Sequence, residues 1–347
     1  MMWYVWMIGK VCIAAVCAYF AYKIGALIYR KLSPRMSRLF DRIKQKLKVD
    51  DRSPIKAKYK EQEEAKMSNR ANILRSTLRV RNSTAEKEVY VYEDHRVILQ
   101  ILHSVVSENK VKAPVNLVYF DYHADDKPPL NSQPVQTLLK QYRQQLPPER
   151  EFWSFVEWDC DTMDGDWLKV GMEVGLIHDA IVVGCQISDS ADETDNQYKD
   201  HTGQIHHIYN LGHLWDGWLD DAAKSAVYSG AWGLLGWEVS QGKFDFNVAG
   251  EPPKPLVLDF DLDCFSVPGP EGEKRHIPWP TEEIYKLFGR PLPHSATSLT
   301  CGKFLQALAE RASLITIARE SDYCGGFQAS AGVLQALDAI LFNGLLD

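Results

Sequence analysis

The sequence lacks the cysteine spacing of a disulfide scaffold. Its 347 residues include seven cysteines, and no two of them form a Cys-x-x-Cys pair. An odd number at irregular spacing favours a reducing compartment over a secreted, disulfide-bonded fold. The chain also has no internal repeat and no low-complexity tract. Its 45% hydrophobic and 11% aromatic content is enough to build a core, which excludes disorder as the overall state.

Acidic residues are almost absent from the beginning of the chain. Residues 1–48 contain ten of the 39 Lys and Arg residues and a single acid, Asp41. Residues 49–347 contain the other 29 basic residues and 45 of the 46 acids, a net charge of −16. An acidic body of this kind would repel phosphate, so we expect no nucleic-acid partner.

The basic leader begins with a long apolar segment. Only Lys10 and Lys23 interrupt residues 1–29, and the stretch from residue 11 to residue 29 is 19 residues long. Because about 20 apolar residues span a bilayer as a helix, residues 1–29 predict a transmembrane helix that anchors a single-pass membrane protein. A cleaved signal peptide and a buried globular helix are alternatives. A signal peptide, however, has its basic residues before the apolar segment.

The charge after the apolar segment predicts its orientation. Residues 30–48 carry eight basic residues beside Asp41, and such flanks stay on the cytoplasmic side. We therefore expect the body to lie in the cytosol. A mitochondrial membrane is an alternative, because the leader is basic and poor in acids. Residues 30–86 as a whole are predicted to be a basic juxtamembrane segment followed by a charged linker.

From residue 87 onward, the pattern is typical of an α/β domain. Short runs of β-branched and aromatic residues predict strands at 88–92, 115–120, 180–183, 256–260 and 314–318. Helical patterns lie at 96–107, 135–144, 168–176, 301–311 and 331–342. This alternation predicts a three-layer α/β/α domain over residues 87–347, with a mainly parallel sheet. In such domains the chemistry gathers at the carboxyl ends of the strands.

The first motif of this kind is Asp121-Tyr122-His123-Ala124-Asp125, directly after a predicted strand. Alternate residues of an extended chain share a face, so Asp121, His123 and Asp125 are expected to point together. Two carboxylates and an imidazole suit a divalent metal. An ordinary polar loop is the alternative, and three ligand-type residues in strict alternation argue against it.

The second motif lies at the end of the predicted strand 256–260, where Asp259, Asp261 and Asp263 alternate with apolar residues. Three carboxylates on one face of a buried strand would repel one another strongly without a cation. A metal ion is the simplest compensation. A protonated Asp or a nearby Arg is the alternative.

Two weaker motifs follow other strands. His95 comes after Tyr92-Glu93-Asp94, and Glu320 and Asp322 come after the strand 314–318. A lone His is usually structural, and surface acids are the alternative for Glu320 and Asp322. Beside the two stronger motifs, His95 becomes a candidate ligand. The set is then large enough for two bridged metal ions, which would activate a shared water as hydroxide and polarise the bond under attack.

This arrangement resembles the arginase/deacetylase superfamily, whose ureohydrolase-like members carry a strand-end His, then D-A-H-x-D, then S-x-D-x-D. It is similar in particular to an uncharacterised arginase-like group with E-D-H, D-x-H-x-D and L-D-x-D-L-D-x-F over residues 87–347. Asp259 takes the serine position, and Glu320 falls where arginases place a late, substrate-facing acid. By this resemblance the metal ligands are His95, Asp121, His123, Asp125, Asp261 and Asp263.

The sequence departs from the arginase pattern at three places. Tyr92-Glu93 stands where the superfamily has a diglycine, Asp126-Lys127 replaces the Asn after D-A-H-x-D, and Cys264-Phe265 replaces an Asp-Pro pair. Recognition of a guanidino substrate is therefore not supported by these residues.

The resemblance implies a metal-dependent hydrolase of a C–N bond in an amidine or amide, with two Mn²⁺ ions; Zn²⁺ and Fe²⁺ are alternatives. Glu320, His178 and Asp166 are candidates for proton transfer and substrate contact. Two other functions compete. In the first, the body is a non-catalytic metal-binding scaffold of the same fold. In the second, it is a phosphatase in which Asp259-Phe260-Asp261 supplies an Asp nucleophile. The phosphatase leaves the D-x-H-x-D motif unexplained.

Overall fold

The computed structural model describes residues 73–160, 165–184, 195–211, 225–238, 243–244, 254–269, 276–292 and 299–346. The predicted membrane helix, residues 1–29, lies outside them and stays a prediction. In the described part of the chain, no helix is both long enough and apolar enough to cross a bilayer.

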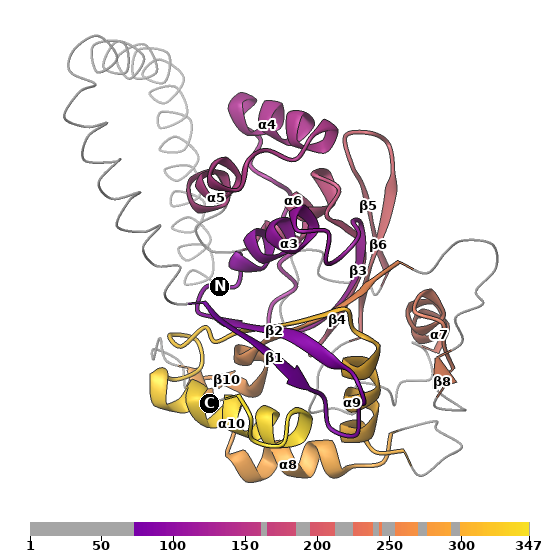
Figure 1. Ribbon diagram of the computed structural model, residues 1–347, viewed down its shortest axis with the longest axis vertical. Coiled ribbons are helices and arrows are strands. Elements are labelled where there is room, and N and C mark those ends of the chain that lie inside the picture. Colours follow the sequence, from indigo (N-terminus) through magenta and orange to yellow (C-terminus); the bar gives the residue numbers. More distant parts are fainter. Residues whose placement is uncertain are drawn as a thin grey trace, which may run out of the picture. The chain divides into compact units, whose positions relative to one another are not determined.

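An eight-stranded sheet forms the centre of the domain (Figure 1). The order of its strands is β1-β2-β12-β9-β3-β4-β6-β5. The six inner strands are parallel, and the edge strands β1 and β5 are antiparallel to their neighbours. The mixed α/β class with a mainly parallel sheet is thus confirmed. The strands are β1 Leu74–Arg79, β2 Glu86–Tyr92, β3 Val115–Phe120, β4 Ile177–Val183, β5 Asp195–Lys199, β6 Ile205–Asn210, β9 Leu256–Asp261 and β12 Leu314–Ala318.

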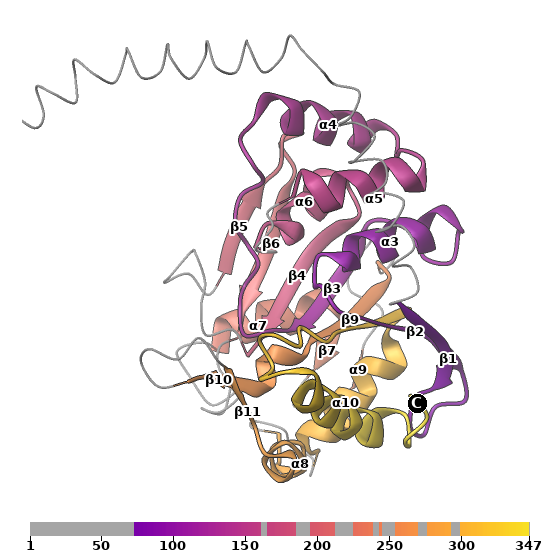
Figure 2. The same cartoon turned by 90° about the vertical axis from the view of Figure 1, so that its left-hand side faces the viewer.

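Helices cover both faces of the sheet (Figure 2). On one face lie α3 Val97–Ser107, α4 Gln133–Gln144, α5 Glu149–Trp158 and α6 Trp167–Glu173. On the other lie α7 Ser225–Leu234, α8 Thr281–Gly289, α9 Cys301–Arg311 and α10 Phe327–Leu341. Short elements complete the described part: the antiparallel pairs β7 Trp237–Glu238 with β8 Lys243–Phe244 and β10 Ser266–Pro268 with β11 His276–Pro278, and the 3₁₀ helix η3 Leu262–Phe265.

The inner strands are apolar at nearly every position because both of their faces are buried. Along β3, Leu117 and Tyr119 enter the core under α3 and α6, whereas Val118 and Phe120 enter the core under α9 and α10. Every residue of β3 and of β9 is buried. A charged side chain on such a strand therefore needs a specific compensating partner.

The domain begins earlier than the sequence analysis expected. Residues 74–79, assigned there to the charged linker, form β1 and pair with β2 along its whole length. The pattern hid this strand because β1 is an edge strand whose residues are exposed or only half-buried, so it has no apolar run.

Four neighbouring strands, β2, β12, β9 and β3, place their carboxyl ends side by side at one edge of the sheet. All four predicted motifs follow these strands. The parallel register thus brings together residues that are more than 200 positions apart in the chain.

Candidate metal centre

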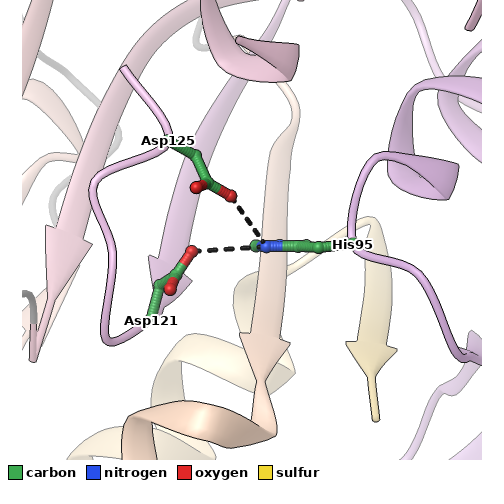
Figure 3. A group of neighbouring side chains, drawn as sticks. All are labelled: His95, Asp121 and Asp125. Atoms are coloured by element: carbon green, nitrogen blue, oxygen red, sulfur yellow. Dashed lines mark ion pairs between the residues drawn. The ribbon is translucent and has the colours of Figure 1, made fainter. Parts of the chain in front are cut away.

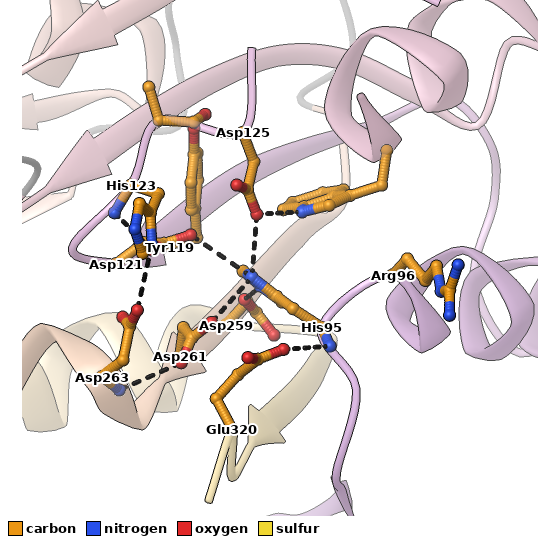
Figure 4. Close-up of polar contacts among 12 residues, drawn as sticks. His95, Arg96, Tyr119, Asp121, His123, Asp125, Asp259, Asp261, Asp263 and Glu320 are labelled. Carbon is orange, nitrogen blue, oxygen red and sulfur yellow. Dashed lines mark hydrogen bonds and ion pairs between the residues drawn. The ribbon is translucent and has the colours of Figure 1, made fainter. Parts of the chain in front are cut away.

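The six predicted ligands converge at this edge of the sheet (Figure 4). His95 follows β2, the loop after β3 supplies three side chains, and the end of β9 and the adjoining η3 supply two. Glu320, from the loop after β12, lies beside them. Among the described residues, two groups of closely spaced ligand atoms stand out, and both belong to this cluster.

The first group surrounds the His95 ring. Its Nδ1 lies 3.3 Å from Asp121 Oδ2, 3.1 Å from Asp125 Oδ2 and 3.1 Å from Asp261 Oδ2. Figure 3 shows Asp121 and Asp125 directed at this nitrogen from the same loop. One nitrogen, with at most one hydrogen, thus faces three carboxylate oxygens.

The second group shares a carboxylate with the first. His123 Nδ1 lies 3.0 Å from Asp263 Oδ2 and 3.8 Å from Asp121 Oδ1. Asp121 therefore turns one oxygen to His95 and the other to His123. A carboxylate shared between two sets of His and Asp ligands is the arrangement that holds two cations a few ångströms apart.

The far side of the His95 ring is fixed by Asp259. Nε2 lies 2.7 Å from Asp259 Oδ2, while Asp259 Oδ1 accepts hydrogen bonds from the hydroxyls of Tyr92, at 3.1 Å, and Thr316. A carboxylate that already accepts from two hydroxyls serves as an acceptor for Nε2–H as well, an arrangement that leaves Nδ1 directed at the other carboxylates and able to bind a cation. The side chain that the sequence analysis placed in the serine position thus orients a ligand.

Burial makes the charge of the cluster costly. His95 is 1% exposed and Asp121 0% exposed, and within the described chain neither His95 Nδ1 nor Asp121 Oδ2 has a hydrogen-bond partner. Buried polar atoms without a partner are rare and call for an explanation. A divalent cation between them would satisfy both atoms, and the oxygen and imidazole donors suit such an ion.

The electrostatics agree with this interpretation. Burial and the neighbouring charges of Asp125 and Asp263 raise the pKa of Asp121 well above its usual value, and burial and Asp263 do the same to the pKa of Asp261. Burial would lower the pKa of His95, but the carboxylates of Asp259 and Asp261 outweigh it and raise that pKa. Without a metal, protons must therefore occupy the place of the missing positive charge.

The loop after β3 turns and does not remain extended as predicted. Asp121 Oδ1 accepts a hydrogen bond of 2.7 Å from the backbone N–H of His123, and Asp125 has a left-handed backbone with φ of 48°. The Tyr119 hydroxyl donates to the Ala124 carbonyl, and the Trp167 indole N–H donates to Asp125 Oδ2. Local hydrogen bonds, and not strand alternation, bring these side chains together.

Alternation holds only in part at the end of β9. Asp259 and Asp261 share a face of the strand, but Asp263 lies in η3. Asp261 Oδ1 caps this helix by accepting from the Asp263 backbone N–H at 3.0 Å. Asp263 Oδ1 in turn accepts from the Tyr122 N–H at 3.0 Å and ties the two ligand loops together.

Glu320 supports the cluster from the loop after β12. Its Oε1 accepts a 2.9 Å hydrogen bond from the His95 backbone N–H, and burial raises its pKa to about 7. Its φ of 40° is left-handed, as is that of Asp125. Strained backbone at non-glycine residues is typical of functional sites, and in the described chain the other non-glycine examples are all asparagines.

Neither of the two residues predicted for proton transfer, His178 and Asp166, belongs to the groups of ligand atoms found among the described residues. His178 is the second residue of β4 and pairs with Asp179 at 2.6 Å, at the amino end of the sheet. The strand length puts it roughly 15 Å from the ligands. Asp166 is buried before Trp167, and neither ligand group among the described residues includes it.

The structure also bears on the phosphatase alternative. Asp259 would have to be a free nucleophile or its partner, but it is 0% exposed and both of its oxygens are bonded to His95, Tyr92 and Thr316.

Sequence reasoning missed this role of Asp259 and the contribution of Trp167. The alternation of Asp259 with Asp261 could have pointed to the role of Asp259. No feature of the sequence points to the hydrogen bond from Trp167.

Comparisons with known proteins add little to this geometry. No protein-family model and no curated protein matches the chain. Among solved structures, the chain is similar to the crystal structure of Helicobacter pylori arginase, with a TM-score of 0.34 and 14% sequence identity over 72% of each chain.

Replacing Asp259 tests its role in orienting His95. We expect Asp259→Ser and Asp259→Asn to weaken Mn²⁺ binding by about 10–100-fold, because loss of this partner frees the ring and lowers its basicity. Isothermal titration of the purified chain measures the affinity. Asp94→Asn is the matched control, since that carboxylate pairs with Arg96 at 2.8 Å. Unchanged affinity in the correctly folded Asp259 variants would contradict this role.

The shared carboxylate predicts a difference between two ligand variants. The wild-type chain should bind two Mn²⁺ ions, His123→Ala should keep the one held by the His95 group, and Asp121→Ala should lose both. Native mass spectrometry and elemental analysis count the ions. Equal metal content in the two variants would refute the arrangement in which Asp121 serves both groups.

Proposed function

We propose that the domain is a metal-dependent hydrolase that cleaves a C–N bond of an amide or amidine, with Mn²⁺ as the expected metal. The observation that carries this proposal is Asp121, which turns one oxygen to His95 and the other to His123 inside two groups of ligand atoms. Two adjacent divalent ions lower the pKa of a shared water and polarise the bond under attack.

The residues of the chain perform three tasks in this proposal. Asp121, Asp125 and Asp261 with His95 would hold one ion, and Asp121 and Asp263 with His123 the other. The backbone of His95 is held by Glu320, and its ring by Asp259. Burial of most of these side chains excludes bulk water, which strengthens the electrostatic effect of each ion on a reacting bond.

The substrate side of the proposal is restricted to amides and amidines. The departures from the arginase pattern at Tyr92-Glu93, Asp126-Lys127 and Cys264-Phe265 remove the sequence support for a guanidino group. A metal-binding scaffold without catalysis would have the same ligands, so turnover separates the two functions.

Turnover should depend on Asp261. The Mn²⁺-loaded full-length chain is assayed for amine or ammonia release from simple amides, acyl anilides and amidines. Asp261→Asn should lower kcat at least 100-fold, because it removes a ligand that faces His95 at 3.1 Å. Asp94→Asn again serves as control. A wild-type chain that binds two ions and hydrolyses none of these compounds would support the scaffold.

We further propose that residues 1–29 anchor the protein in a membrane with its body in the cytosol. Charge supports this orientation, since basic residues follow the apolar segment. The domain carries a natural reporter: Asn82 of the sequon Asn82-Ser83-Thr84 is exposed in the turn between β1 and β2.

The proposed anchor and orientation give three expected outcomes in cells. The full-length chain should resist alkaline carbonate extraction, a chain lacking residues 1–29 should become extractable, and neither should change mobility on treatment with an N-glycosidase. A glycan on Asn82 that disappears in Asn82→Gln would place the body in a secretory lumen and refute the orientation.

A further inference from the structure

We propose that His276 is the proton-transfer residue of this site, an inference that rests on the hydrolase proposed above. His276 begins β11, which pairs with β10, and β10 starts three residues after Asp263. No sequence pattern singled it out. The geometry gives its ring a fixed orientation, a place beside the accessible ligand, and a suitable charge state.

Ser266 fixes the orientation of the ring. Its Oγ lies 3.0 Å from His276 Nδ1, 2.8 Å from the Asp263 carbonyl oxygen and 3.1 Å from the Tyr323 carbonyl oxygen. Both carbonyl oxygens can only accept, which favours a hydroxyl hydrogen directed at them and a hydrogen bond donated from His276 Nδ1–H to the Ser266 oxygen. Nε2 of a neutral His276 ring is then unprotonated and able to act as a base.

Ring contacts place His276 next to the accessible part of the cluster. Tyr122 packs edge-on against both His276, at 5.6 Å between centroids, and His123, at 5.0 Å. Tyr323 does the same, at 5.7 Å and 6.1 Å. The two histidines are thus held by the same pair of tyrosines.

The ligand side chains differ in their exposure to solvent. The side chain of His123 is 35% exposed, whereas that of its partner Asp263 is 1% exposed. His276 is itself half-buried. In this proposal a substrate approaches along the exposed side of His123, where the two shared tyrosines also hold His276. Glu320 is instead bonded to the backbone of the buried His95.

The charge environment keeps this imidazole neutral. Burial lowers the pKa of His276, Asp263 raises it and His123 lowers it, with a net decrease from the ordinary value. The rings of the titratable residues Tyr122 and Tyr323 also pack against the imidazole. A neutral ring with an unprotonated Nε2 is the form that accepts a proton near pH 7.

The proton is transferred twice in the proposed reaction. Water adds through its oxygen to the amide or amidine carbon, and His276 Nε2 takes one of its protons. The C–N bond then breaks with its electron pair on nitrogen, and His276 delivers the same proton to that nitrogen. One water is consumed, an amine or ammonia leaves, and the ring returns to its neutral form.

The tautomer is tested first, by ¹⁵N NMR of the full-length chain without metal and with diamagnetic Zn²⁺. We expect His276 to show Nδ1–H and an unprotonated Nε2 at pH 7, and Ser266→Ala to convert the ring to a mixture of tautomers. An Nε2–H tautomer in the wild-type chain would overturn the assignment whether or not the protein is an enzyme.

Kinetics of the Mn²⁺-loaded chain form the second arm, with the amide and amidine panel named above. His276→Asn keeps a donor near the Nδ1 position but cannot carry the proton. It should lower kcat by about 100-fold or more, change KM less than threefold, and remove the acidic limb of the pH profile. Its metal content should stay at that of the wild type.

The outcomes separate this inference from the proposed function. Turnover that His276→Asn leaves within threefold of the wild type overturns the assignment alone. A wild-type chain without bound metal or turnover overturns the hydrolase and the assignment together. His201→Gln is the matched control, because His201 binds Glu173 at the turn between β5 and β6, and it should keep wild-type kinetics.

Discussion

Repulsion among buried carboxylates is the constraint on which this domain depends. Asp121, Asp261 and Asp263 come from the ends of two adjacent strands and have almost no access to water. Asp121 and Asp263 belong to one group of ligand atoms, and Asp121 and Asp261 both face His95 Nδ1. Such a cluster folds only if protons or cations neutralise it. The surroundings favour the cation, since Asp259 fixes the hydrogen of His95 on Nε2 and leaves Nδ1 facing the carboxylates.

The sheet and the loops contribute differently to the cluster. Parallel strands bring distant segments to one edge, which sets the position of the ligands to within the width of a few strands. The loops set the rest. An Asp121 turn, the indole of Trp167 and the left-handed residues Asp125 and Glu320 direct individual oxygens. The strain at these two acids is the cost of that orientation.

Sequence reasoning anticipated the strands that carry the site, because buried parallel strands are apolar throughout and end in polar residues. It also named the six side chains that meet there. It could not give the strand order, which depends on contacts between residues far apart in the chain. It gave no reason to consider His276, since a lone histidine on a short strand has no periodicity. The role predicted for His178 stays a prediction, and the structure places that residue at the amino end of β4.

The place of β12 in the sheet has a consequence for shortened forms of the chain. β12 contributes none of the six candidate ligands, yet it lies between β2 and β9 and pairs with both. A product ending before residue 314 would therefore keep every ligand in its sequence and still lack the strand that spaces His95 from Asp261. A transcript or fragment that encodes all six candidate ligands therefore need not form the metal centre. The last 34 residues, which include β12, are required to place His95 beside the ligands of β9.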